Sequence, residues 1–359
     1  MGRIIQIYGQ DAHSMTVRLL EAQDAIALVP AGGSVALKPN LVIAGKPENG
    51  ATTHPGVLSG CIEYFRAHGV EDISVIEGSW VGDDTMDAMR EAGYDQVCRR
   101  YNVPFYDLKK DRTRTMQTAV GPIDICARAL DAGLLVDLPV LKGHGQTIMT
   151  CALKNLKGCL PDREKRHFHA MGLQKPIGAL GALLKPRLIV VDSLCGDLDF
   201  EEGGNPVQTN RMYLGTDAVQ LDAYGAALMG LRKEDVPYIG YAERWGGGSS
   251  AWSDADIIEL NTPQAAVKYP KPSGMVARLT KNVKQNNACS ACFANLTRAL
   301  YSDGRDFRST DLRIGQGWRG QSWDGLGIGN CCMGASCCVR GCPPTARQIL
   351  DKLEEMQEG

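Results

Sequence analysis

Seven of the chain's 13 cysteines lie near its C-terminus, in two groups whose spacing suits metal binding. The first group is the C-x-x-C turn "CSAC", from Cys289 to Cys292, which lets two thiolates converge on one metal centre. The second is the stretch "GNCCMGASCCVRGCPP", which holds the other five. A ligating cysteine followed by proline is typical of ferredoxin-type clusters, and Cys342 precedes Pro343. The two groups therefore predict an iron–sulfur site.

The spacing is enough for one four-cysteine [4Fe–4S] cluster. Adjacent cysteines point apart, so that each doubled pair supplies at most one ligand to a given centre. We expect Cys289, Cys292 and Cys342 to be three of the ligands, and Cys331 to complete the set. The doubled pairs leave alternatives to Cys331, namely Cys332, Cys337 and Cys338. Two complete four-cysteine clusters would need more cysteines than this region has.

Other sulfur chemistry fits the pattern less well. Zinc also takes four thiolates, usually from two short knuckles, but "CCMGASCC" is not a simple second knuckle and Cys342 would be left over. A metal-free thiol relay is a further alternative. An odd cysteine count and a reducing cytoplasm disfavour a disulfide framework. The remaining cysteines lie mainly in apolar segments and are expected to be buried: Cys61, Cys98, Cys126, Cys151, Cys159 and Cys195.

Charged and polar residues also gather at the ends of apolar, strand-like segments. Lys38 and Asn40 end "VALKPN", and Glu77 is near the end of "ISVIEGS". Asp137 lies within "LLVDLP", and Asp192 ends "LIVVD". In open parallel sheets ligands bind beyond the carboxyl ends of the strands, so these segments predict a shared ligand site. Solvated loop tips are the alternative interpretation.

The basic stretch "KGHGQTIMTCALKNLKGCLPDREKRHFH", residues 142–169, adds cations to the same region. Clustered cations near a helix end and a glycine-rich loop would attract a carboxylate or phosphate. A solvated basic face is the alternative, and the pair His167 and His169 is a weak metal signal. The expected anion-binding residues are Asn40, Lys142, Lys154, Asn155 and Lys157. The expected catalytic residues are Lys38, Glu77, His144 and Asp192, with Asp137 as a further acid–base candidate.

The order of segments predicts an α/β domain over residues 1–262, with a mostly parallel sheet and flanking helices. Apolar runs rich in Val, Ile and Leu are typical of strands buried on both faces. Strands are expected at 3–9, 34–41, 72–79, 103–108, 134–144, 187–196 and 254–260, and helices within 15–29, 54–69, 83–94 and 216–230. The proline-rich "TPQAAVKYPKPSG" is typical of a linker. Residues 263–359 are expected to form an irregular iron–sulfur-binding segment that ends in a helix.

The composition is that of an ordinary soluble protein: of 359 residues 44% are hydrophobic and 22% charged, and the net charge is −2. This balance gives no sign of nucleic-acid binding. The N-terminus lacks a signal-peptide core, and no stretch approaches a membrane span, so we expect a cytoplasmic protein. Walker A, dinucleotide-binding and nucleophile-elbow motifs are absent from the sequence. A homo-oligomer is compatible with these features.

Several of these segments resemble domain-of-unknown-function family 362. They are "VALKPNLV", "TTHPGVLSGCIEYF", "VLKGHGQTIMTCALKNLKGCLP", "LIVVDSL" and "GTDAVQLDAYGA", within roughly residues 30–230. The resemblance implies an α/β fold. Several family members carry an added iron–sulfur segment, and "CSAC…GNC…GCPP" is similar to a C-terminal form of it. The resemblance implies no settled reaction.

Together these features predict an iron–sulfur enzyme that acts on an anionic small molecule bound at the strand ends. Electron transfer is the favoured chemistry, because enough cysteines exist to ligate every iron, and an electron-donor protein would then be a partner. One alternative is a lyase or dehydratase in which an open iron acts as a Lewis acid. A second is a non-catalytic electron carrier that docks an acidic redox partner. A third is an α/β hydrolase- or isomerase-like enzyme with a structural zinc.

Overall fold

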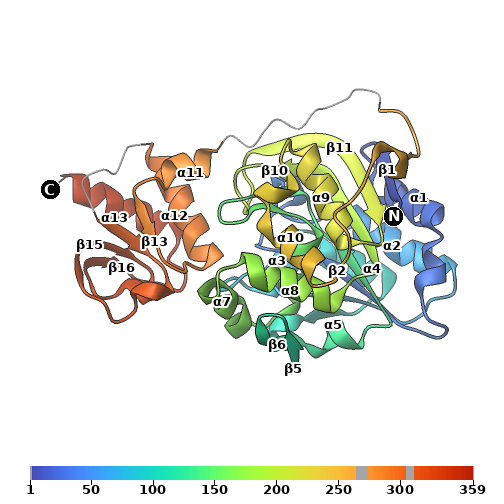
Figure 1. The fold of residues 1–359 in the computed structure, drawn as a ribbon, viewed down its shortest axis with the longest axis horizontal. Coiled ribbons are helices and arrows are strands. Elements are labelled where there is room, and N and C mark those ends of the chain that lie inside the picture. The colour runs from blue at the N-terminus through green and yellow to red at the C-terminus, as the bar shows by residue number, and fades with distance from the viewer. Residues whose placement is uncertain (1, 264–273, 305–310, 359) are drawn as a thin grey trace.

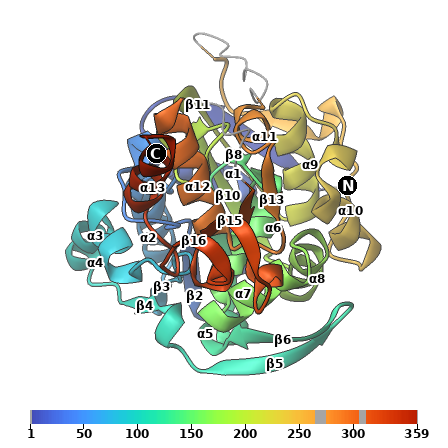
Figure 2. The ribbon, with the colours of Figure 1, turned by 90° about the vertical axis from the view of Figure 1, so that its left-hand side faces the viewer.

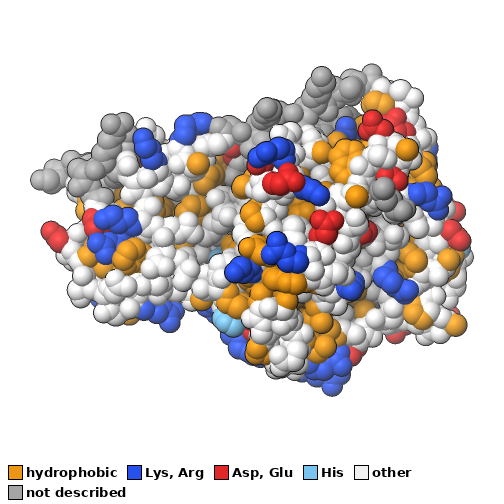
Figure 3. All heavy atoms as spheres, viewed as in Figure 1, with side chains coloured by type: hydrophobic (Ala, Val, Ile, Leu, Met, Phe, Trp, Pro, Cys, Tyr) orange, Lys and Arg blue, Asp and Glu red, His pale blue; other side chains and the backbone are white. Residues whose placement is uncertain are grey.

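The computed structural model describes residues 2–263, 274–304 and 311–358. Figure 1 shows a large α/β body, formed by residues 2–263, and a smaller body formed by the C-terminal elements. Most of the expected linker, with Pro270 and Pro272, lies in residues 264–273, outside the described residues. Acidic and basic side chains are interspersed over the face seen in Figure 3, in keeping with the small net charge.

The large body is built on one eight-stranded sheet. Its strands lie in the order β12 (Ile257–Glu259), β1 (Ile4–Tyr8), β11 (Pro206–Gly215), β10 (Leu188–Asp197), β7 (Leu134–Leu138), β2 (Val35–Pro39), β3 (Ile73–Glu77) and β4 (Phe105–Asp107). All neighbours pair in parallel except at β11, which is antiparallel to both β1 and β10. The predicted α/β fold with a mostly parallel sheet is confirmed.

Helices cover both faces of this sheet because successive strand residues point to opposite sides. In β2, for example, Val35 and Leu37 face one hydrophobic core and Ala36 faces the other. The first core is covered by α1 (Ala12–Gln23), α2 (Pro55–Ala67), α3 (Thr85–Glu91) and α4 (Tyr94–Tyr101). The second is covered by α5 (Ala127–Asp131), α6 (Ala152–Asn155), α7 (Asp162–Ala170), α8 (Gln174–Leu184), α9 (Ala218–Leu228) and α10 (Pro237–Arg244).

Two hairpins extend the large body beyond the expected elements. The first pairs β5 (Thr113–Thr118) with β6 (Gly121–Cys126), and the second pairs β8 (Lys142–His144) with β9 (Ile148–Thr150). The expected strand at 134–144 is therefore two strands, β7 in the large sheet and β8 in a hairpin. This break places the basic stretch above the sheet instead of within it.

The C-terminal body is more regular than the sequence suggested. It contains α11 (Met275–Leu279), β13 (Val283–Gln285), α12 (Ser290–Asp303), β14 (Leu312–Ile314), β15 (Trp323–Ile328), β16 (Ala335–Val339) and α13 (Ala346–Glu358). The strands form a parallel sheet in the order β13, β14, β15 and β16. Leu296, Ile314, Leu326 and Ile349 lie in its own hydrophobic core. Strands of three to six residues are too short for a periodicity argument to detect.

The two bodies meet through specific contacts, and Figure 2 looks onto the C-terminal body with the large sheet behind it. Gln146 Nε2 donates to the Ala288 carbonyl over 3.0 Å. Gln316 Nε2 donates to the Arg166 carbonyl over 3.0 Å. None of the helices in the described parts of the chain has the length and apolarity needed to cross a membrane.

Candidate functional site

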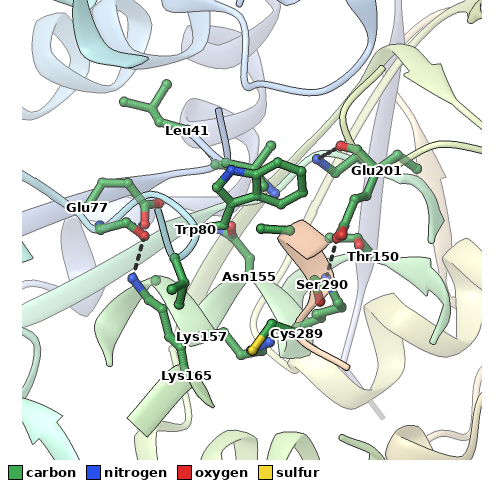
Figure 4. A pocket seen from close by; sticks show the side chains of 18 of the residues that line it. Leu41, Glu77, Trp80, Thr150, Asn155, Lys157, Lys165, Glu201, Cys289 and Ser290 are labelled. Carbon is green, nitrogen blue, oxygen red and sulfur yellow. Dashed lines mark hydrogen bonds and ion pairs between the residues drawn. The ribbon is translucent and has the colours of Figure 1, made fainter. Parts of the chain in front are cut away.

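A cavity lies at the carboxyl ends of β2 and β3 and is closed by the start of α12 (Figure 4). β3 follows β2 in the chain and lies on one side of it, whereas β7, which comes later in the chain, lies on its other side. The order of the strands therefore reverses at β2, and open α/β sheets bind ligands at such a reversal. We call this cavity the lysine pocket, because Lys142, Lys154, Lys157 and Lys165 line it.

Six of the nine predicted pocket residues line this cavity, and the other three are buried outside its lining. The lining residues are Asn40, Glu77, Lys142, Lys154, Asn155 and Lys157. Of the other three, Lys38 and His144 each contact a lining residue, whereas Asp192 is hydrogen-bonded to His54, which is not a lining residue. Trp80, Thr150, Glu201 and Ser290 also line the pocket, and no sequence pattern had predicted them.

Lys38 fixes the carboxylate of Glu77 at the pocket wall. Its ammonium donates to Glu77 Oε2 over 2.6 Å and to the Pro39 carbonyl over 2.9 Å. Glu77 Oε1 also accepts from the Gly78 N–H over 2.7 Å. Burial alone would lower the pKa of Lys38, but the negative groups around it, of which Glu77 has the largest effect, together raise it. Lys38 therefore stays charged and positions Glu77.

Asn155 connects this pair to β7 beneath the pocket. Its side-chain N–H groups donate to Asp137 Oδ1 over 2.8 Å and to the Lys38 carbonyl over 3.4 Å. Burial raises the pKa of Asp137 to about 8, against the opposing effects of Lys38 and Asn155. Asp137 is thus largely protonated at neutral pH. Its Oδ2 has no hydrogen-bond partner among the described residues.

Glu201 enters the pocket from the loop after β10 and is held by His144 and Lys154. His144 Nδ1 accepts from the N–H groups of Gln146 and Thr147, at 2.9 and 3.2 Å. Burial lowers the pKa of His144 to about 4, so the ring is neutral and its Nε2–H is directed at Glu201. Lys154 Nζ lies 3.4 Å from Glu201 Oε2. Burial opposes ionisation of Glu201, but His144 and Lys154 hold its pKa below the ordinary value.

The lysines of the pocket outnumber the carboxylates that compensate them. Burial lowers the pKa of Lys142 and of Lys157 to about 7, and that of Lys165 to about 8. Lys142 and Lys165 donate to backbone carbonyls, whereas Lys157 contacts only His169, at 3.4 Å, among the described residues. Thr150 Oγ is buried and has no hydrogen-bond partner in the described chain. An anion would supply the negative charge and acceptors that these groups need.

Asp192 and the two predicted histidines of α7 have separate roles. Asp192 accepts from the N–H groups of His54 and Leu194, at 2.7 and 3.0 Å, and so fixes the segment that leads into α2. His167 is half exposed and contacts Glu164. His169 is buried, lines the pocket and accepts from the Ser290 N–H over 3.3 Å. The two histidines therefore point to different surroundings.

A second cavity, which we call the cysteine hollow, brings together Cys289, Cys292, Cys331 and Cys342. Cys289 is the N-cap of α12 and Cys292 lies in its first turn, whereas the other two lie in the loops at the two ends of β16. The alternative cysteines do not line the hollow. Cys332 is buried against the Gly315 carbonyl, Cys338 is directed at the Gly329 carbonyl, and Cys337 packs on the C-terminal core.

The surroundings of these thiols suit a cationic group. Burial, and then the charges of Cys331 and Cys342, raise the pKa of Cys289 to about 11. A metal centre reverses this preference because it stabilises thiolates. Gly329, which lines the hollow, has a φ of 86°, a left-handed backbone conformation that favours glycine. Across the described residues, no three His, Cys, Asp or Glu side chains are placed as ligands of a single metal ion.

The two cavities share a wall. Val81, Cys289 and Ala291 line both the lysine pocket and the cysteine hollow. Gly82 packs closely against Pro343, because a Cβ on Gly82 would lie 2.1 Å from Pro343 Cδ. The loop after β3 therefore joins the edge of the pocket to the loop that carries Cys342.

Comparison with known proteins shows the family to which this chain belongs. The sequence model described as "Domain of unknown function (DUF362)" matches residues 35–227. Over 233 residues the chain is 26% identical to the thylakoid-associated protein sll1697 of Synechocystis sp.. This alignment covers 61% of this chain and 70% of that protein. The lactate racemase apoprotein of Thermoanaerobacterium thermosaccharolyticum aligns with a TM-score of 0.44 and 15% identity. That alignment covers 63% of this chain and 56% of the racemase.

Proposed function

We propose that this chain, which belongs to the DUF362 family, is an iron–sulfur oxidoreductase with a small anionic substrate. The substrate would bind in the lysine pocket, and a [4Fe–4S] cluster would be held beside it in the cysteine hollow. The observation that supports both halves of the proposal is the shared wall of Val81, Cys289 and Ala291. A pocket with this lining would have no purpose in a pure electron carrier.

Cys289, Cys292, Cys331 and Cys342 would hold the cluster. A bound [4Fe–4S] cluster exchanges single electrons. Four cysteine ligands leave no iron open, which favours electron transfer over Lewis-acid chemistry. The thiols stand around a hollow instead of converging on one point, and this favours a cluster over a single zinc ion, whose four ligands must meet at one tetrahedral centre.

The chain's own residues would bind the substrate and control protons. Lys142, Lys154 and Lys157 attract the anion, and Thr150 Oγ can donate to it. Glu201 keeps Lys154 in place through its ion pair. Among the predicted catalytic residues, Glu77 alone lines the pocket, where Lys38 fixes its carboxylate for acid–base work.

The cluster is tested by metal analysis of protein purified without oxygen. We expect iron and inorganic sulfide in equal amounts, about four of each per chain, together with a broad visible absorption. Serine variants of Cys289, Cys292, Cys331 and Cys342 should each lose most of the iron. Cys338→Ser is the matched control, because Cys338 lies on the adjacent strand outside the hollow. Stoichiometric zinc, or iron that survives all four substitutions, would contradict the assignment.

The anion site is tested by calorimetry with sulfate and with short dicarboxylates as probes. Lys154→Met should weaken binding at least tenfold, because it removes a buried cation from the pocket. Arg163→Met is the control, since Arg163 belongs to the same basic stretch but is exposed and paired with Asp124. Equal losses in both variants would show that the probes sense only general surface charge.

A further inference from the structure

Three residues line both cavities, namely Val81, Cys289 and Ala291. The side chains of Val81 and Ala291 are hydrocarbon. Cys289 belongs to both sites, because it lines the lysine pocket and is one of the four cysteines of the hollow. Figure 4 shows Cys289 and Ser290 at the edge of the lysine pocket, with Lys157 nearby. Each cavity thus lies within one side chain of the other.

Basic side chains line both cavities, so a net negative group would be stabilised in each of them. The lysine pocket has cations in excess, and the cysteine hollow is flanked by Arg166 and Arg319. Arg319 donates to Cys331 Sγ through two N–H groups, at 3.3 and 3.4 Å. A four-thiolate [4Fe–4S] cluster carries net negative charge, and reduction adds one more electron to it.

Two negative groups on either side of an apolar wall repel each other. At a separation on the order of 10 Å and an effective dielectric constant near ~20, the repulsion between two unit charges corresponds to roughly tenfold in an equilibrium constant. Salt would screen this repulsion less than it screens two surface charges, because Lys142 and Lys154 on the pocket side are buried, although Cys342 on the other side is exposed.

We propose that anion binding in the lysine pocket and reduction of the cluster oppose each other. A bound anion lowers the reduction potential of the cluster, and reduction weakens anion binding by the same factor, as linkage requires. This coupling rests on the proposed function. It would make transfer of the electron depend on whether the substrate is bound. The cluster becomes a stronger one-electron reductant when an anionic acceptor is in place.

The electron count is simple. A reduced electron-carrier protein gives one electron to the oxidised cluster, and the reduced cluster gives one electron to the bound substrate and is oxidised again. A two-electron reduction of the substrate takes two such cycles. In the first cycle the cluster would be reduced before the substrate binds, so the repulsion would favour the transfer to the substrate. In the second cycle the cluster would be reduced again beside the bound one-electron intermediate, and the electron-carrier protein would have to supply that electron at the lowered potential.

The test is a redox titration of the intact, cluster-loaded chain, followed by electron paramagnetic resonance. Potentials are set electrochemically with cationic viologen mediators, so that no anionic reductant enters the pocket. Sulfate replaces chloride at constant ionic strength, which keeps general screening unchanged. We expect the midpoint potential to fall as sulfate is added and then to level off. Tenfold weaker binding to the reduced form corresponds to a fall of about 59 mV.

Two variants separate the sites. Lys154→Met should remove the response to sulfate, because it weakens the anion site. Arg319→Gln should lower the potential in chloride but keep the sulfate response, because Arg319 lines only the cysteine hollow. A potential that stays constant or rises at sulfate concentrations shown by calorimetry to saturate the protein would overturn the coupling, and so would a failure of sulfate to bind. A chain purified without any iron–sulfur cluster would instead refute the proposed function itself.

Discussion

The lysine pocket and the cysteine hollow share a wall, but their polar groups are satisfied in different ways. In the pocket, Lys38 is paired with Glu77, and Lys154 is paired with Glu201. In the described parts of the chain, the thiols of Cys289, Cys292 and Cys342 donate no hydrogen bond, and burial raises the pKa of the first two. The pocket is therefore held by ion pairs between the protein's own side chains. Under the proposed function, the cysteines of the hollow would instead be held together by the cluster.

Removal of the cluster should produce the largest difference between the two sites. A chelator applied under oxidising conditions should expose residues 274–358 to proteolysis, because the loops around β16 lose their common anchor. The α/β body should stay folded, since its two hydrophobic cores and its sheet do not depend on the cysteines of the hollow. Hydrogen exchange read by mass spectrometry would show this. Equal loss of protection in β2 of the α/β body and in β15 of the C-terminal body would show that the two bodies depend on the cluster equally, contrary to this prediction.

Lys38→Met should be the most damaging substitution in the pocket. It leaves the carboxylate of Glu77 buried without its partner, which typically costs about 3–5 kcal/mol in unfolding free energy. Urea unfolding of the α/β body measures the loss. The double variant Lys38→Met with Glu77→Gln should recover much of it, because no uncompensated charge then remains. A single-variant loss below about 1 kcal/mol would mean that the pair is open to water.

Anion affinity should fall with rising pH, although the cluster content should not. An anion binds the protonated form of Lys142, whose pKa in the free protein is about 7. At pH 6 this lysine is charged, and at pH 8 most of it is neutral, so sulfate affinity should drop about tenfold between these values. Calorimetry at both pH values gives the ratio. Lys157 has a pKa of about 7 as well, so Lys142→Met should reduce the drop and the double variant with Lys157→Met should flatten the profile. A profile that rises with pH would contradict the assigned charge.

The smallest effect is expected at exposed ion pairs. Arg90 and Asp87 on α3 are more than half exposed, so Arg90→Ala should change the unfolding free energy by no more than about 1 kcal/mol. Urea unfolding alongside Lys38→Met compares a surface pair with a buried one in the same body. A loss as large as that of Lys38→Met would show that burial is not what makes the pocket pairs strong.

The sequence predicted the sheet and much of the site because both depend on local signals. Buried parallel strands appear as continuous apolar runs, and the polar residue that ends each run, such as Asn40 or Glu77, falls at the ligand-binding edge. The C-x-x-C turn and the proline after Cys342 are likewise recognised from neighbouring residues alone. β11 was missed because the first part of the strand is mostly polar, and only its last four residues are all buried.

Other parts of the site depend on tertiary packing that no local pattern encodes. Glu201 lies in an acidic loop and becomes buried only where the β8–β9 hairpin brings His144 against it. Lys38 and His144 were expected to face the ligand, but they stand behind residues that do. The spacing of the doubled cysteines could not distinguish Cys331 from its alternatives, because the choice depends on how β16 packs against α12.

Anomalous diffraction at the iron edge, from crystals grown without oxygen, would locate the metal and identify its ligands. We predict iron density in the cysteine hollow, bonded to Cys289, Cys292, Cys331 and Cys342, and separated from the lysine pocket only by Val81, Cys289 and Ala291. Crystals soaked in selenate should show a second anomalous peak among Lys142, Lys154 and Lys157. A single metal ion, iron bound to other cysteines, or selenate outside the pocket would contradict the account.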